Sequence, residues 1–200
     1  MQNSETSTIL VPYGLKSLTV PSSLKVHSKL DPSDKQIWDA TYDEEYDSLC
    51  SLPSWEVIAE EQNHKLCKGQ KALPTMAISA IKYDAHNKPK RAKYRIVVLG
   101  NLDYHTWSRE ATAAPVLSQL DLHLLTSLAV HHRRSLKKCD VKQAFVQSSL
   151  SEDEVYFLKP PVGCPRSNPK HYWPLIRSLY GLKRAPKLWF DTLCKHLLFT

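Results

Sequence analysis

The sequence predicts an α+β domain in which mixed and antiparallel strands are packed by helices. Strand-like and helix-like segments alternate irregularly along the chain, without an internal repeat. The 200 residues are 42% apolar and 24% charged, a composition typical of a globular protein with a sizeable core. Residues 1–33 mix Ser, Thr, Pro and Lys with no sustained period, so we expect a poorly ordered leader before a domain over 34–200.

A helix is predicted over about 34–51, with Ser33 or Asp34 as its N-cap. One face carries large apolar side chains at helical spacing, namely Trp38, Tyr42 and Leu49. Glu45 falls on the same face. Because a buried carboxylate is costly without a partner, Glu45 either meets a basic residue of a neighbouring strand or lies at an edge, in water.

Two strands, 77–83 and 92–99, are predicted to form a hairpin around a polar turn that contains Pro. The hairpin is basic, because one Asp stands against six cations: Lys82, Lys88, Lys90, Arg91, Lys93 and Arg95. In the second strand Lys93 and Arg95 share one face, opposite Tyr94. This basic face either neutralises phosphate groups or is simply solvated.

A second helix is predicted over about 118–131, where leucines recur at helical spacing. They form one apolar stripe: Leu117, Leu120, Leu124, Leu125 and Leu128. We interpret this segment as a core helix without chemistry. The basic run 131–138 suits the helix C-terminus, and its cations either stay solvated or touch phosphates.

The rest of the chain predicts a loop over 101–115, which has no clean period, then three short strands and a last helix. Residues 139–145 are expected to form a short buried strand that turns into a loop or helix, and 154–159 and 173–179 are expected to be strands. Pro186 then opens a helix over about 187–199.

The composition excludes several classes of protein. The net charge of +7 and the pI of about 9.1 suit a polyanion such as nucleic acid, although a merely basic protein has the same balance. No segment approaches a membrane span, and the N-terminus lacks the pattern of a secretory signal. The five cysteines have no CxxC spacing, which indicates reduced intracellular thiols. HExxH, GxSxG, P-loop and GxGxxG motifs are absent.

Asp140 is the first candidate for chemistry. It stands between a basic run and an apolar segment, where the chain turns. An acid at the end of a buried strand is costly unless it is paired or bound to a metal. Asp140 is therefore either a catalytic or metal-binding residue, or the salt-bridge partner of a nearby cation.

From Lys35 to Thr200 the chain resembles the reverse transcriptase of copia-type LTR retrotransposons, most closely those of microalgae. The matching pieces follow the family's order: the spaced Trp38, Tyr42, Glu45, Leu49 and Trp55; KYRIVVLGN at 93–101; APV at 114–116; DVKQAF at 140–145; L.E..VY and PP.G within 150–163; and SLYGLKRAPKLWF at 178–190. Ala113 and Ser149 depart from the family's usual aromatic and glycine residues, as in a decaying or truncated copy.

The resemblance implies part of a right-hand polymerase, with the fingers and part of the palm present. It implies RNA-directed DNA synthesis with Mg²⁺, deoxynucleoside triphosphates, an RNA template and a DNA primer. Asp140 matches the family's first catalytic aspartate, and the main-chain carbonyl of Val141 is implied as a further metal ligand. The family's Tyr-x-Asp-Asp hairpin is expected beyond Thr200, so this chain alone is expected not to polymerise.

The resemblance also implies residues that bind the nucleotide. Phe145 matches the aromatic beneath the sugar, which would exclude a 2′-hydroxyl, whereas the alternative is a plain core aromatic. Lys93 and Arg95 match the strand that approaches the triphosphate. The loop near the template base and the nucleotide is matched by Tyr180, Gly181 and Lys183, for which a turn before the last helix is the alternative. Nucleic-acid contacts are expected from Lys82, Lys88, Lys90 and Arg91.

The family further implies the rest of the Pol polyprotein as a partner, no membrane, and an intracellular location in a cytoplasmic particle and the nucleus. One alternative is a non-catalytic remnant of a decayed element that keeps the basic hairpin and binds nucleic acid. Another is a misfolded relic, in which the apolar faces of 117–128 and of the last helix lack cover.

Overall fold

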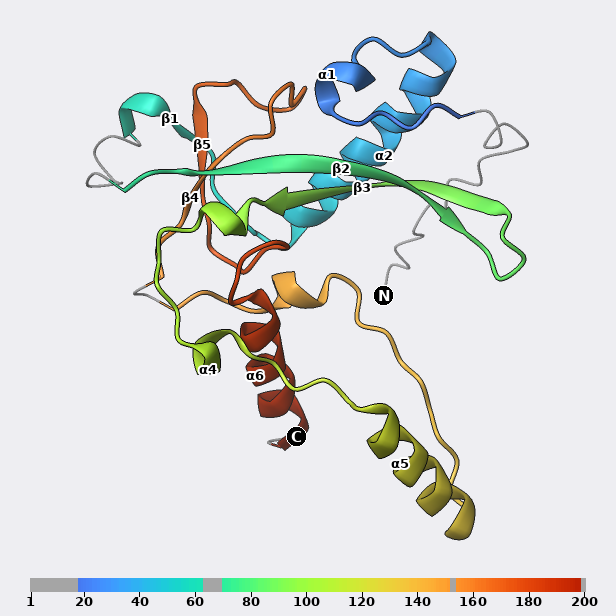
Figure 1. Ribbon diagram of the computed structural model, residues 1–200. Helices are drawn as coiled ribbons and strands as arrows, with labels where there is room; N and C mark the ends of the chain where they lie inside the picture. Colours follow the sequence, from blue (N-terminus) through green and yellow to red (C-terminus); the bar gives the residue numbers. More distant parts are fainter. Residues whose placement is uncertain (1–17, 63–69, 152–153, 199–200) are drawn as a thin grey trace, which may run out of the picture.

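A mixed five-stranded sheet lies at the centre of the computed structural model, which describes residues 18–62, 70–151 and 154–198 (Figure 1). The strand order is β1-β5-β4-β2-β3. β2 (Leu73–Tyr83) and β3 (Pro89–Val98) form a long antiparallel hairpin, and β2 pairs in parallel with β4 (Phe157–Lys159). β5 (His171–Pro174) joins β4 to β1 (Ile58–Ala59) and is antiparallel to both. The sequence-based expectation of a mixed sheet packed by helices is confirmed.

Residues 1–17 of the predicted leader lie outside the described residues, so the structure describes only its last part, residues 18–33. This last part contains α1 (Leu24–His27), which is capped by Ser23 through a bond from the Val26 N–H to the Ser23 hydroxyl. Leu24 is buried in the main core and His27 is buried beside it. Isolated apolar anchors such as Leu24 leave no periodic pattern in the sequence, so the order of this segment could not be predicted.

α2 (Pro32–Ser51) confirms the first predicted helix, but its start differs from the prediction. The helix begins after Asp31 with Pro32 at its first position, and neither Ser33 nor Asp34 is the N-cap. The Asp34 carboxylate instead accepts a hydrogen bond from the backbone N–H of Thr19, at 3.0 Å. Tertiary contact with the preceding segment thus replaces a local cap.

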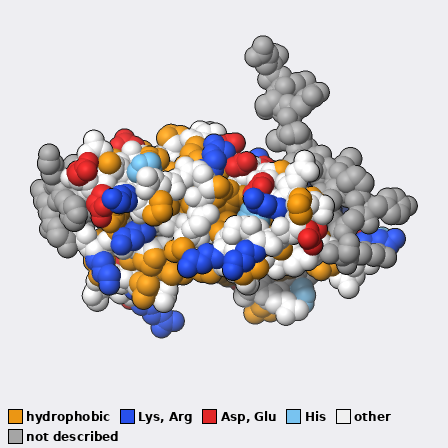
Figure 2. Space-filling model, turned by 90° about the horizontal axis from the view of Figure 1, so that it is seen from above, with side chains coloured by type: hydrophobic (Ala, Val, Ile, Leu, Met, Phe, Trp, Pro, Cys, Tyr) orange, Lys and Arg blue, Asp and Glu red, His pale blue; other side chains and the backbone are white. Residues whose placement is uncertain are grey.

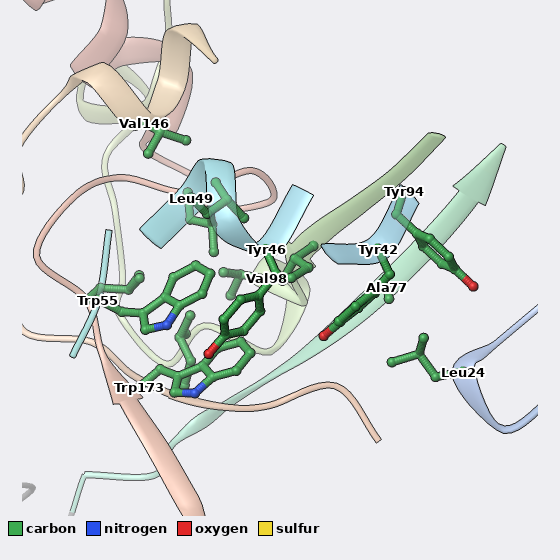
Figure 3. Packing of buried hydrophobic residues seen from close by; sticks show 14 of the residues in the cluster. Leu24, Tyr42, Tyr46, Leu49, Trp55, Ala77, Tyr94, Val98, Val146 and Trp173 are labelled. Carbon is green, nitrogen blue, oxygen red and sulfur yellow. The ribbon is translucent and has the colours of Figure 1, made fainter. Parts of the chain in front are cut away.

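The core lies between α2 and the hairpin. Trp38, Tyr42 and Leu49 are fully buried, as the helical spacing predicts. Trp38 and Tyr42 both meet the ring of Tyr94 on β3 edge to face, with ring centroids 5.3 and 5.5 Å apart. Figure 3 shows Tyr42 and Tyr94 beside aliphatic residues of the same cluster, such as Ala77 and Leu24.

A second aromatic contact closes the other end of the core. Trp55, from the segment after α2, stacks on Trp173 of β5 with a centroid separation of 4.6 Å and an interplanar angle of 8° (Figure 3). Both rings are buried. This stack ties α2 to the β4–β5 side of the sheet.

The C-terminal elements follow the predicted order with shifted bounds. β4 and β5 are shorter than the predicted strands 154–159 and 173–179. α6 (Ala185–Leu198) confirms the last helix. The segment 101–115, expected to be a loop, contains the short α4 (Arg109–Thr112), preceded by the 3-10 turn η2 (Gly100–Leu102).

α5 (Gln119–His131) confirms the second predicted helix, but its assignment to the core is wrong for the described residues. Ser118 and Asp121 form a capping box, so the helix is locally well specified. Its leucine stripe is nevertheless exposed, with Leu120 77% and Leu124 57% exposed, and Ala129 is its one buried residue. Figure 1 shows α5 extending away from the sheet and apart from the other labelled helices. Helical spacing creates an apolar face but does not supply its partner.

The predicted strand at 139–145 does not form. Residues 139–141 are irregular and exposed, and the chain then enters the 3-10 turn η3 (Ala144–Gln147) after Gln143 in a left-handed conformation. A strand requires a neighbour for its backbone hydrogen bonds, and no described strand lies alongside this segment. No helix in the described segments has the length and apolarity needed to cross a bilayer.

Candidate active site

Tyr180 lies where three segments that are distant in sequence meet. The guanidinium carbon of Arg95, from β3, lies 5.7 Å from the centroid of the Tyr180 ring. The ring of Phe145, from η3, meets Tyr180 edge to face at 5.5 Å. A cation over one aromatic ring and a second ring against its edge are both favourable arrangements. The structure therefore brings together three residues that the sequence singled out separately.

Asp140 belongs to the same neighbourhood. Burial is the largest cause of the raised pKa of Tyr180, and the negative charges of Glu45 and Asp140 add to it, while Arg95 opposes it. Asp140 also precedes Phe145, the ring that contacts Tyr180, by five residues. Asp140 itself is exposed, and no described Lys, Arg or His forms an ion pair with it. The alternative role of Asp140 as a salt-bridge partner thus finds no support in the described residues.

Glu45 of α2 lies near the basic residues of β3, Lys93 and Arg95. Its side chain is buried, and burial raises the pKa of Glu45, whereas the charge of Lys93, a backbone hydrogen bond from Ile96 and the charge of Arg95 oppose that rise. Within the described residues the Oε1 atom of Glu45 has no hydrogen-bond partner. The pKa of Lys93 is lowered by burial and raised in part by Glu45. The basic neighbours expected for Glu45 are therefore on β3.

The loop that carries Tyr180 is held against the end of β3. The backbone N–H of Val98 donates to the carbonyl oxygen of Tyr180 at 2.8 Å. Gly181 has a φ of +93°, and a Cβ at this position would lie 2.1 Å from the carbonyl oxygen of Val98. The close backbone approach predicted for Gly181 is thus to Val98 within the chain, which supports the structural alternative for this residue.

Lys183 points to a different place. Its Nζ donates to the backbone carbonyl of Asp103 at 3.2 Å, and its side chain lines a pocket together with residues of the segment 103–107. The sequence grouped Lys183 with Tyr180 and Gly181 because they are neighbours in one motif. In the structure, the side chains of Lys183 and Tyr180 have separate partners.

The remaining cations lie along the hairpin. Lys82, Lys88, Lys90 and Arg91 are exposed, and Lys82 pairs with Arg91 across the two strands. Asp84 stabilises the hairpin turn, because its carboxylate accepts hydrogen bonds from the backbone N–H groups of His86 and Lys88 at 2.8 and 2.9 Å. Figure 2 shows Lys and Arg side chains interspersed with hydrophobic ones along the lower edge of one face of the molecule. Such a mixture suits contact with nucleic acid.

The described residues supply only part of a metal site. Asp140 provides one exposed carboxylate, and Val141, which is also exposed, follows it in the chain. No cluster of three or more His, Cys, Asp or Glu side chains suitable for a metal occurs in the described parts of the chain. A pair of Mg²⁺ ions needs more oxygen ligands in a defined geometry than these two residues offer. The described donor set therefore does not fit two metal ions.

Sequence reasoning missed one organised region. The segment 101–115 was expected to be a loop, yet the side chain of Asp103 is completely buried and accepts hydrogen bonds from His105 and Trp107. A signal was present in the sequence, because Asp often bonds the backbone two residues on and orders a turn. Spacing alone did not reveal that the side chains would converge.

The part of the chain that matches known proteins contains all of the site residues that were predicted from the sequence. A family described as reverse transcriptase (RNA-dependent DNA polymerase) matches residues 58–199. The chain is 29% identical over 150 residues to the retrovirus-related Pol polyprotein from transposon RE1 of Arabidopsis thaliana, covering 72% of this chain and 10% of that protein. It is 30% identical over 148 residues to the corresponding polyprotein from transposon TNT 1-94 of Nicotiana tabacum, covering 74% and 10%.

A further relative is the retrovirus-related Pol polyprotein from transposon RE2 of Arabidopsis thaliana, 31% identical over 122 residues that cover 58% of this chain and 8% of that protein. The chain thus spans about a tenth of the length of the curated relatives it matches. No solved structure matches it. The matches do not favour the alternative of a non-catalytic, basic remnant of a decayed element that binds nucleic acid.

Proposed function

Because this chain belongs to the reverse transcriptase (RNA-dependent DNA polymerase) family, in its copia-type branch, we propose that it forms the fingers and part of the palm of an RNA-directed DNA polymerase. The observation that carries the proposal is the contact of Arg95 and Phe145 with Tyr180, with the exposed Asp140 five residues before Phe145 in the chain. These residues come from β3, η3, the segment before η3 and the loop before α6.

Each group has a chemical task toward a deoxynucleoside triphosphate. Arg95 and Lys93 would neutralise phosphate oxygens, for which charge-assisted hydrogen bonds from cations are well suited. Phe145 would lie beneath the sugar, where a flat ring leaves no room for a 2′-hydroxyl. Tyr180 holds both Arg95 and Phe145, so it is a positioning residue.

Asp140 would supply a carboxylate ligand to a divalent cation, for which Mg²⁺ is the finer proposal, and the Val141 carbonyl would be a second ligand. Such a cation, when bound, stabilises the charge that develops on a phosphoryl group in transfer. The exposed cations Lys82, Lys88, Lys90 and Arg91 would bind the phosphates of the RNA template and the DNA primer. We further propose that the rest of a Pol polyprotein is a partner of this chain, and that the chain is located in a cytoplasmic particle and in the nucleus.

The test is binding of a fluorescent RNA template annealed to a recessed DNA primer. The purified chain should bind this hybrid with an affinity that falls steeply as salt rises. A deoxynucleoside triphosphate added with Mg²⁺ should then bind to the complex, and Asp140→Asn should weaken the Mg²⁺ dependence of that step while leaving hybrid binding intact.

Two results would contradict the proposal. One is the absence of salt-dependent binding to the hybrid. The other is a triphosphate affinity that is unchanged by both Asp140→Asn and Arg95→Gln. Arg95→Lys is the matched control, because it keeps the charge and loses only the planar geometry of the guanidinium.

A further inference from the structure

Asp103 organises the short loop that follows β3. Its side chain is completely buried, and its Oδ1 atom accepts from the backbone N–H and the Nδ1 of His105 at 3.0 and 2.8 Å. Its Oδ2 atom accepts from Trp107 Nε1 at 3.2 Å and from the Tyr156 hydroxyl at 3.4 Å. A buried carboxylate with four donors is well compensated and fixes the rings that bond to it.

Two of the rings that Asp103 fixes, those of His105 and Trp107, form a column with the ring of Tyr104. Tyr104 and His105 lie with their centroids 4.4 Å apart, His105 stacks on Trp107 at 5.4 Å, and the guanidinium of Arg184 covers Trp107 at 4.7 Å. Arg184 is paired with Glu154, so its charge is already neutralised. Tyr104 is 42% exposed, so the column continues from the interior to the surface.

A pocket of about 580 Å³ opens beside this column. Tyr104, His105 and Trp107 form its aromatic side, Thr106 and Thr112 bring hydroxyl groups, and Lys183 brings a cation. This volume is in the range of sites for small organic groups, including a nucleobase with its sugar. Lys183 is bonded to a neutral carbonyl and forms no ion pair with any described residue, so its charge is available to an anion.

We infer that the pocket beside Tyr104, His105 and Trp107 binds one nucleotide of a single-stranded stretch of nucleic acid. The base would stack on the aromatic side, and Lys183 would hold a flanking phosphate. An exposed aromatic surface with one cation beside it suits an unpaired base, because the bases of a duplex are already stacked and paired. The inference rests on the proposed function, which supplies nucleic acid as the partner, but it concerns a site separate from the Tyr180 group.

The test uses the whole chain and a labelled single-stranded oligouridylate, with a blunt RNA–DNA hybrid as the second probe. Tyr104→Leu should weaken oligouridylate binding by about tenfold and leave hybrid binding unchanged, because the loss of one stacked base has an effect of about this size. Tyr104→Phe keeps the ring and should bind like the wild type. Lys183→Gln should reduce the slope of the logarithm of oligouridylate affinity against the logarithm of salt concentration by the amount of about one single-strand phosphate contact. Lys183→Arg should restore the slope.

Photocrosslinking of a 5-bromouridine oligonucleotide locates the contact without a variant. Crosslinks on Tyr104, His105 or Trp107 support the inference, and crosslinks confined to other segments overturn it. Uridine monophosphate is the competitor. If it displaces the oligonucleotide at equal nucleotide concentration, the pocket binds free nucleotides and the inference is overturned. If the wild type binds neither probe, the proposed function fails. If it binds both and Tyr104→Leu changes neither, only this inference fails.

Discussion

Gly181 is packed so closely against Val98 that a Cβ atom on Gly181 would lie only 2.1 Å from the carbonyl oxygen of Val98. The adjacent carbonyl of Tyr180 accepts the Val98 N–H, so the contact is fixed on two sides. This contact sets the position of Tyr180 relative to β3, and hence relative to Arg95 on the same strand.

Gly181→Ala is therefore expected to be strongly destabilising. The left-handed backbone conformation by itself costs about 1–3 kcal/mol for a residue with a Cβ, and the clash with Val98 adds to that cost. We expect a loss of more than about 3 kcal/mol in the free energy of unfolding, measured by urea denaturation. Gly163→Ala is the matched control, because Gly163 also has a positive φ, of +86°, but its nearest contact is the Leu24 side chain at 3.3 Å. Equal losses for the two variants would show that the Val98 contact has no energetic consequence.

Glu45 should make stability depend on pH in an unusual direction. Burial raises the pKa of Glu45 in the folded chain above its ordinary value of 4.5. The folded state then takes up a proton before the unfolded state does, so lowering the pH favours folding through this group. Relative to Glu45→Gln, the wild type should gain stability as the pH falls from neutrality through the raised pKa, and the gain should be complete below about 4.5.

The measurement is urea denaturation of both proteins at several pH values. Glu44→Gln, on the exposed side of the same helix, controls for the general loss of one negative charge. A difference between the wild type and Glu45→Gln that stays constant with pH would contradict the burial of a titrating carboxylate.

The exposed leucine stripe of α5 should make the isolated chain associate with itself. Apolar patches of this kind are uncommon on soluble monomers and promote aggregation. Light scattering should show larger species as the concentration rises, and the combined change Leu120→Lys and Leu124→Lys should restore a monomer. His123→Lys on the same helix adds a cation without removing a leucine and should not do so. An unchanged monomer for all three proteins would show that the stripe is covered in solution.

Phe145 should control the choice of sugar if the proposed function holds. Phe145→Ala should reduce the preference for a deoxynucleoside over a ribonucleoside triphosphate by about tenfold or more, because the flat obstacle to the 2′-hydroxyl is removed. Competition binding on the chain with its hybrid measures this ratio. Phe145→Tyr keeps the ring and should retain the preference. A preference that survives Phe145→Ala would make Phe145 a packing residue for Tyr180 alone.

Local patterns in the sequence were enough for the elements that carry their own information. The spacing of Trp38, Tyr42 and Leu49 specified both the helix and its buried face, because a 3.6-residue period places them on one side. The hairpin followed in the same way from two strand-like segments around a polar turn. The family was also recognisable from sequence, since its motifs are ordered along the chain.

Only the tertiary structure decided which of these surfaces meet. The sequence named Arg95, Phe145 and Tyr180 separately, and their contact depends on how β3, η3 and the loop before α6 pack. The tertiary structure gives the side chains of Lys183 and Tyr180 separate partners, and it organises the expected loop 101–115 around Asp103 to form one side of a pocket. It left the α5 stripe exposed and the segment around Asp140 without strand pairing. The physical reason is that periodicity is encoded within a segment, whereas burial and strand pairing require a partner that lies far away in the sequence.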